Sequence, residues 1–207
     1  FTVLLLAVIG YRMPPALLNT LETQWLLQAW RWLPLNLPER RVLLVDIDER
    51  SLQTLGAWPW SSDKLLQLAQ RVQQAGASVQ VWDVVLPPPR DAAVLQPLAH
   101  HPPVLAQVFG LLPSQTLVHG QAAGAAPIEC PATFWQAYGV LGNTSGLAAW
   151  PTGHITPILN QDGAVTHLPA VVCYHRQSYL SLGLQALAQL AAPPSSQHVW
   201  QLQAGSS

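Results

Sequence analysis

The chain has 207 residues, enough for one sizeable domain. Only 9% of its residues are charged, against roughly 25% in an ordinary soluble domain, and the net charge is -1. There is no basic block or stripe, so the composition argues against a nucleic-acid partner. Half of the residues are hydrophobic, which allows a substantial core.

The chain begins with the uncharged run "FTVLLLAVIG". A membrane-spanning helix needs about 20 apolar residues, so this run is too short to cross a bilayer by itself. It has no basic start and no small-residue cleavage site, so it does not resemble a signal peptide. We therefore expect residues 1–13 to be the C-terminal part of a transmembrane helix. The alternative is a short helix buried in a core.

Residues 14–38 have an amphipathic pattern followed by a break. Leu17, Leu21 and Trp25 fall near one helical face. The tryptophans of this segment suit a membrane interface, or they pack the helix onto the domain. Pro34 and Pro38 end the helix. The predicted organisation is therefore a membrane-proximal helix and linker over 14–38, followed by a folded domain over 39–207.

The next three segments predict a βαβ unit. "RVLLVDIDE" (41–49) has the near-continuous apolar run of a parallel strand covered on both faces. "SSDKLLQLAQRVQQAG" (61–76) has serines at the start of a helix and glycine at its end. "ASVQVWDVVLP" (77–87) reads as the second strand. Such a unit has a right-handed crossover and a parallel strand pair.

The fold class expected is therefore α/β, with a partly parallel sheet from the βαβ unit, a β-hairpin and a membrane-proximal N-terminal helix. "GVLGNTSG" follows no clear strand and is only a weak candidate for a phosphate cradle. The remaining expected elements are a short helix with Pro97 within 91–101, a strand over 102–112, loop with short pieces of structure over 113–150, a hairpin over 154–175 turning at Asp162-Gly163, and a helix over 178–192.

Three aspartates lie at predicted strand ends. Asp46 and Asp48 point to the same side of the first strand, and Asp83 ends the second. If the strands are adjacent, these carboxylates meet at the carboxyl edge of the sheet and could hold a hard cation. The alternative is that Asp48 caps a helix beginning at Glu49, while the other two carboxylates accept backbone N–H bonds.

Trp58 and Trp60 flank Pro59 in "GAWPWS", just after the first predicted strand. This loop either anchors itself in the core or forms one wall of an apolar binding pocket. The candidate ligand-binding residues are therefore Asp46, Asp48, Trp58, Trp60 and Asp83. Of these, the three aspartates would hold any metal. No catalytic residue is predicted, and no cofactor is identified.

Enzyme motifs are incomplete. A D-x-D phosphohydrolase of the haloacid-dehalogenase type needs a lysine beside the phosphate and a second acidic cluster. Lys64 is the single lysine, at the start of a predicted helix, and no Asp-Asp pair occurs. The seven histidines show no metal-ligand spacing. A phosphohydrolase is therefore the weakest of the functions considered.

The two cysteines, Cys130 and Cys173, fit no zinc or redox spacing. We interpret them as two buried free thiols. A disulfide is the alternative if the domain lies outside the cytoplasm.

The segment from Val42 to Pro89 resembles the type-two CHASE domain, a cyclase/histidine-kinase-associated sensory extracellular module of bacterial receptors. That family shows an apolar strand ending D-x-D-x-x-S/T, then L-G-x-W-P-W, a helix, G-A and a strand ending in Asp. The later "GHITPILNQDGAVTHLP" is similar to the family's G-H and D-G hairpin. The resemblance spans residues from about 15 to 190. The matching positions are Asp46, Asp48, Ser51, Leu55, Gly56, Trp58, Pro59, Trp60, Gly76, Ala77, Asp83, Gly153, His154, Asp162, Gly163 and Pro169.

The chain also departs from the family pattern. Ser61-Ser62-Asp63 stands where an arginine commonly follows W-P-W, and His167 replaces the hairpin arginine. A role of those arginines in binding an anion, or in pairing with the aspartates, is therefore not expected here. The family's domain usually continues with further strands, so the resemblance implies that the sensory domain over 39–207 is incomplete at its C-terminal end.

The resemblance implies a non-catalytic sensory domain on the extracytoplasmic (periplasmic) side of the inner cell membrane. The N-terminal helix would enter the membrane, and the stimulus would be an unidentified small molecule or ion. The domain would relay this stimulus through transmembrane helices to a cytoplasmic cyclase or kinase, with a homodimer expected. The rival function is a structural dimerisation module without a ligand of its own.

Overall fold

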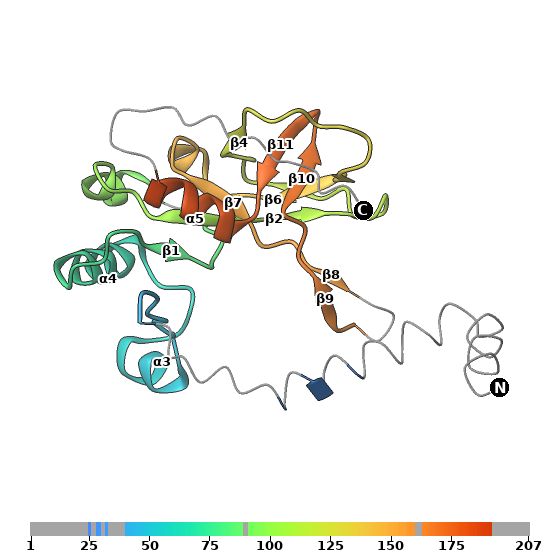
Figure 1. Cartoon of the computed structure of the whole chain (residues 1–207). Coiled ribbons are helices and arrows are strands. Elements are labelled where there is room, and N and C mark those ends of the chain that lie inside the picture. Colours follow the sequence, from blue (N-terminus) through green and yellow to red (C-terminus); the bar gives the residue numbers. More distant parts are fainter. Residues whose placement is uncertain are drawn as a thin grey trace. The chain divides into compact units, whose positions relative to one another are not determined.

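The computed structural model describes residues 40–88, 91–159 and 163–191, together with Trp25, Gln28, Ala29 and Trp32, except for the side chain of Thr166. The chain divides into two compact units, Phe1–Thr54 and Leu55–Ser207, and each is described by itself. Figure 1 shows the ribbon of the chain with its elements labelled.

The N-terminal predictions fall mostly outside the described residues. Residues 1–24, which include the expected membrane segment, are not among them. The four described positions between 25 and 32 are helical, and Trp25 and Trp32 are exposed. Among the helices that the structure describes, none is long and apolar enough to cross a membrane.

The first predicted strand does not form. Residues 42–48 have no regular secondary structure and belong to no sheet, and α3 (Glu49–Leu55) follows directly. Val42, Leu43 and Leu44 are exposed. A strand requires a partner for its backbone N–H and C=O groups, and no described strand pairs with this segment. The predicted βαβ unit that begins at 41–49 is therefore wrong.

The second unit carries the three sheets that the structure describes, two larger ones and a two-stranded one. Its elements in chain order are α4 (Ser62–Gln74), β1 (Val81–Trp82), the 3-10 helix η1 (Ala93–Leu98), β2 (Val104–Gly110), β3 (Val118–His119), β4 (Ala125–Ala126), β5 (Trp135–Gln136), β6 (Gly139–Leu141), the 3-10 helix η2 (Ser145–Leu147), β7 (Thr152–His154), β8 (Ile158–Leu159), β9 (Val165–His167), β10 (Val171–Tyr174), β11 (Gln177–Leu180) and α5 (Leu182–Ala191).

Helix α4 forms where its sequence predicts. Ser61 is in the extended N-cap conformation, and the helix buries Leu65 and Ala69. Gly76 has a φ of +94°, which only glycine adopts without strain, so the helix ends there. The helix packs against η1, the short helix expected around Pro97.

The first sheet is mixed. Its order is β1-β2-β6-β3, with β7 on the other edge of β2. β1 and β2 are parallel and connected through η1, and β2 and β7 are also parallel. β6 runs antiparallel to β2. The expectation of a partly parallel sheet is thus met, but by β1, β2 and β7.

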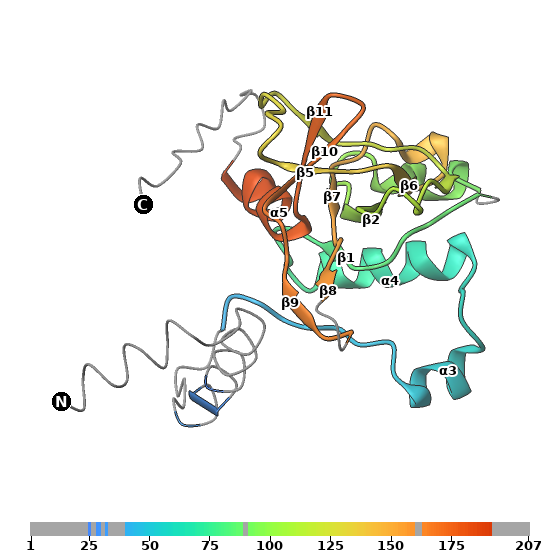
Figure 2. The same ribbon diagram turned by 90° about the vertical axis from the view of Figure 1, so that its right-hand side faces the viewer.

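The second sheet is smaller and has the order β4-β11-β10-β5. β10 and β11 form a hairpin that turns at His175 and Arg176, both with positive φ. β8 and β9 form the hairpin expected around Gly163. Both views show this β8–β9 hairpin projecting from the two larger sheets (Figures 1 and 2).

The C-terminal helix was predicted to begin too early. Residues 178–180 belong to β11, and α5 begins at Leu182. The run "SYL" pairs with β10, and Ser178 and Tyr179 are buried there. A free strand edge overrode the helical periodicity of this short segment.

The core has two parts, on opposite faces of β2. Alternation along the strand places Val104 and Ala106 on one face, where they pack with Leu182 of α5. Phe109 lies on the other face and packs with Val140 and three residues of the second sheet: Val172, Tyr174 and Tyr179. β2 is therefore covered on both faces, and it has strand neighbours on both edges.

Candidate functional site

Asp48 acts as a helix cap. Its Oδ1 accepts hydrogen bonds from the Ser51 hydroxyl at 2.6 Å and from the Ser51 amide at 2.8 Å. The hydroxyl first and then the amide lower the pKa of the Asp48 carboxyl below its ordinary value. This is the capping alternative of the sequence analysis, and it gives the second aspartate of the D-x-D a structural role at the start of α3.

Asp46 and Asp83 are exposed and make no side-chain hydrogen bond within the described part of the chain. The same described residues contain no group of three or more His, Cys, Asp or Glu side chains able to hold a metal ion. Asp46 and Asp48 lie in the first unit, while Trp58, Trp60 and Asp83 lie in the second. The convergence of these five side chains stays a prediction.

The tryptophan loop before α4 is held by its own polar groups. The Trp60 indole Nε1 donates to the Gly56 carbonyl at 2.8 Å, and the Lys64 ammonium donates to the Leu55 carbonyl. Gly56 has a φ of +95°, and the Trp58–Pro59 bond is cis. Trp60 is 5% exposed and Trp58 is 38% exposed, with their ring centroids 6.0 Å apart. Trp60 anchors the loop, and the Trp58 ring forms part of the surface.

A set of buried polar side chains lies along β2 and its neighbours, and we call it the polar junction: Gln107, Asn143, His154 and Thr156. The Gln107 amide makes two bonds to the Ala123 backbone, donating to its carbonyl and accepting from its N–H. Asn143 donates to the Ala106 carbonyl at 2.9 Å and accepts from the Leu86 N–H at 2.8 Å. The Asn143 amide thus links β2 to the segment at Leu86, and the Gln107 amide links β2 to the loop at Ala123. These side-chain bonds satisfy backbone groups that no neighbouring strand pairs.

The weak phosphate-cradle candidate has a different role. The first three residues of "GVLGNTSG" form β6 itself, and its Asn143 is buried in the interior. Gly142 lies so close to Gln121 that an added Cβ would meet its carbonyl oxygen. Glycine at position 142 therefore allows the backbone to lie close to that of Gln121, and the segment has a structural role.

His154 is the least satisfied member of the polar junction. It is 0% exposed. Its Nδ1 accepts a hydrogen bond from the Thr156 N–H at 3.4 Å, while its Nε2 has no hydrogen-bond partner among the described residues. The ring lies edge-on to Phe109, with centroids 6.2 Å apart. Burial lowers the pKa of His154 to about 4, so the imidazole is neutral at pH 7.

The position of His154 connects three elements. Register pairs it with Gln107 of β2, and a bridge joins it to Ser181 immediately before α5. A Cβ on the preceding Gly153 would lie 2.6 Å from the Leu182 Cα. Gly153 therefore brings β7 close to α5 on one face of the strand, and the His154 imidazole lies buried on the other face.

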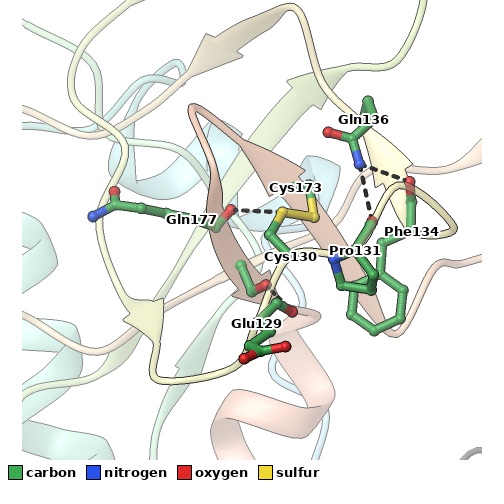
Figure 3. Close-up of a disulfide and its surroundings, with 8 residues drawn as sticks. Glu129, Cys130, Pro131, Phe134, Gln136, Cys173 and Gln177 are labelled. Carbon is green, nitrogen blue, oxygen red and sulfur yellow. Dashed lines mark hydrogen bonds between the residues drawn. A yellow bond between two sulfur atoms is a disulfide. The ribbon is translucent and has the colours of Figure 1, made fainter.

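The two cysteines form a disulfide that joins the loop before β5 to β10 (Figure 3). Their Cα atoms are 5.8 Å apart, within the range that a disulfide spans. Cys173 is fully buried and Cys130 is half-buried. The interpretation as two free thiols is therefore wrong. Nearby, the Ser178 hydroxyl donates to the Glu129 carbonyl, which also holds this loop on the second sheet.

Gln107 and Asn143 were not among the predicted site residues, and His154 was named only as part of the family-like G-H motif. Two signals were available: a polar residue within the apolar run "VLAQVFG", and the G-H of the family-like hairpin. Neither motif contains a nucleophile with an adjacent base. The polar junction can exchange a proton or a hydrogen bond, and it can fix the relative positions of strands.

The comparison with protein families matches one family model, the CHASE2 domain, over residues 3–205. The match covers nearly the whole chain. No curated protein and no solved structure matches.

Proposed function

The chain belongs to the CHASE2 domain family of extracellular sensory domains, and from this premise we propose that it is the input domain of a bacterial membrane receptor. The match over residues 3–205 carries this proposal. The domain receives a stimulus outside the cytoplasm and relays it through transmembrane helices to a cytoplasmic cyclase or kinase. The Cys130–Cys173 disulfide supports an oxidising compartment such as the periplasm.

The chemistry of the described residues supports a non-catalytic role for this segment. Asp48 is used as a helix cap, and the ammonium of Lys64 is bound to the Leu55 carbonyl. These are the two groups that a D-x-D phosphohydrolase would need free. The proposal therefore assigns catalysis to the output domain of the receptor.

The location is tested by fusing alkaline phosphatase or a green fluorescent protein after Ser207 within the full-length gene. Alkaline phosphatase is active only where disulfides form, so we expect an active phosphatase fusion and a dark fluorescent fusion. The reverse pattern would place the domain in the cytoplasm and end the receptor proposal. A location outside the cytoplasm would also agree with our proposal that residues 1–13 belong to a membrane-spanning helix.

The stimulus site that we propose includes Asp46, Asp48, Trp58, Trp60 and Asp83, with a small molecule or cation as ligand. Asp46→Asn is the cleanest variant, because Asp48 also caps α3. Titration calorimetry with Mg²⁺ and with Ca²⁺ should show binding to the wild-type chain that this variant abolishes. Asp63→Asn, at an exposed aspartate of α4, is the matched control and should bind as the wild type does. Equal binding by both variants would exclude Asp46 as a ligand.

We also propose that the domain acts as a homodimer. The low charge content leaves little like-charge repulsion between copies. Sedimentation equilibrium over a hundredfold concentration range should give a monomer–dimer equilibrium. A dimer that binds neither cation and whose receptor output is constant would favour the rival function, a structural dimerisation module.

A further inference from the structure

His154 has two nitrogens in different situations. Within the described part of the chain, its Nε2 is the single buried side-chain nitrogen or oxygen without a hydrogen-bond partner. Its Nδ1 accepts from the Thr156 amide, so the hydrogen bond assigns the neutral tautomer with hydrogen on Nε2. A second proton must therefore bind at Nδ1, the atom that now accepts the Thr156 N–H.

Protonation at Nδ1 has a direct structural consequence. A protonated Nδ1 is a donor and can no longer accept, so it opposes the Thr156 N–H. The Thr156 Oγ1 also accepts a hydrogen bond from the Phe109 amide at 2.8 Å. Phe109 stands at the centre of the core between the two sheets. Charging the imidazole thus breaks one link of a chain that runs from β7 to this core.

Among the described residues, the elements packed against β7 carry no carboxylate that could balance an imidazolium at His154. β7 packs against β2, α5 and β11. Neither β2 nor α5 contains a titratable residue, and β11 contributes only Tyr179. Tyr174 of β10 lies across the Phe109 ring and offers no carboxylate. The ring is fully buried, so water does not solvate it either.

We propose that His154 is a proton-operated switch at the junction of β7, α5 and the second sheet. Proton binding favours a conformation in which the imidazolium reaches water. The buried packing around His154 described above offers the charged ring neither a carboxylate nor a free acceptor. The step is a simple proton uptake from solvent onto Nδ1. The pKa of His154 is lowered to about 4, which agrees with a buried site that disfavours the charged imidazolium.

The opening acts on α5. His154 bridges Ser181, and its neighbour Gly153 contacts the backbone of Leu182 where the helix begins. Moving the ring toward water therefore displaces the start of α5 from the sheet, where Leu182 packs on Val104 and Ala106. If the proposed receptor function is correct, protons are then a stimulus of this receptor, and this last step rests on that proposal.

The test follows near-ultraviolet circular dichroism and tryptophan fluorescence of the whole chain from pH 7.5 to 3.5 and back. The wild type should show a reversible transition below pH 6.5. His154→Gln, which cannot titrate, should lower its midpoint by at least about one pH unit or abolish it. His101→Gln, at an exposed histidine after η1, is the control and should leave the transition unchanged.

A measurement on the wild type covers the case in which His154→Gln does not fold. Nitrogen-15 NMR of labelled histidines should show His154 as the Nε2–H tautomer at pH 7, with a titration that coincides with the transition. A histidine that titrates near its ordinary pKa without a conformational change would overturn the switch. So would a transition that His154→Gln leaves in place. Neither result bears on the topology assay, so the switch and the receptor function fail separately.

Discussion

Two apolar runs of this chain end in opposite environments. Residues 42–47 ("VLLVDI") have no regular secondary structure and are largely exposed, whereas β2 ("VLAQVFG") lies in the interior. β2 bonds to β1, β6 and β7, and α5 and the second sheet cover its faces. It even buries the polar Gln107, because the backbone of Ala123 satisfies both ends of the amide. Burial therefore depends on which neighbours a run acquires, more than on its apolar content.

The largest expected effect contrasts one leucine from each run. Leu105→Ala, at a fully buried position of β2, should lower the free energy of unfolding by about 2–5 kcal/mol. Leu44→Ala, at a residue that is 88% exposed, should change it by less than about 0.5 kcal/mol. Urea denaturation followed by circular dichroism measures both. Similar losses in the two variants would show that residues 42–47 are buried in solution as the originally predicted strand.

The disulfide sharpens the contrast between the two sheets. Cys130 and Cys173 are 43 residues apart, and a cross-link over such a loop stabilises by about 4 kcal/mol in the chain-entropy account. The double variant Cys130→Ala/Cys173→Ala should lose stability of this order. Hydrogen exchange should rise most in β10 and β5, which carry and flank the cross-link. Uniform exchange across both sheets would mean that the disulfide stabilises the whole unit equally.

Acid should destabilise the interior around β2 through His154. Its pKa is lowered from 6.5 to about 4 in the folded chain, so between these values the unfolded chain binds a proton that the folded chain does not. Stability is therefore fully kept above pH 6.5 and falls as the pH drops, by about 3 kcal/mol in total at pH 4. Urea midpoints measured between pH 7 and 4 should show this slope, and His154→Phe should flatten it. An equal slope in that variant would assign the acid lability to other groups.

The smallest effect belongs to the exposed region. Asp48→Ala removes the acceptor of both Ser51 bonds and should increase amide exchange in α3 by a few-fold without changing exchange in β2. Asp48→Asn keeps an acceptor and serves as the control. The pKa of Asp48 is lowered, so the cap persists above the ordinary carboxyl pKa and is lost as the pH falls through the lowered one. A loss of global stability in Asp48→Ala would show that α3 supports the interior.

Several elements were predictable because their signals are local. α4 has its serines, its apolar face and Gly76 at the stop, and β2 has a long apolar run. The short helix with Pro97 also forms as predicted. The hairpin around Gly163 forms over a shorter range than predicted, because β7 pairs with β2 and β10 pairs with β11 and β5. The strand over 41–49 and the early start of the last helix were wrong, because both depended on which strands were available for pairing.

The site was less predictable than the fold. The sequence pointed to aspartates and tryptophans at strand ends, and the capping alternative for Asp48 proved correct. It did not indicate that His154, one of seven histidines, is fully buried with an unpaired nitrogen. Nor did the spacing of Cys130 and Cys173 reveal their bond.

The sequence by itself determined the family, the helix boundaries with local caps and the presence of a largely apolar, weakly charged domain. These properties depend on residues that are near one another in the chain. Tertiary structure alone decided the partners of β2, the pairing of the cysteines and the environment of His154. Each of these depends on groups that are distant in sequence, and a buried polar atom acquires its energy only from the neighbours that folding places around it.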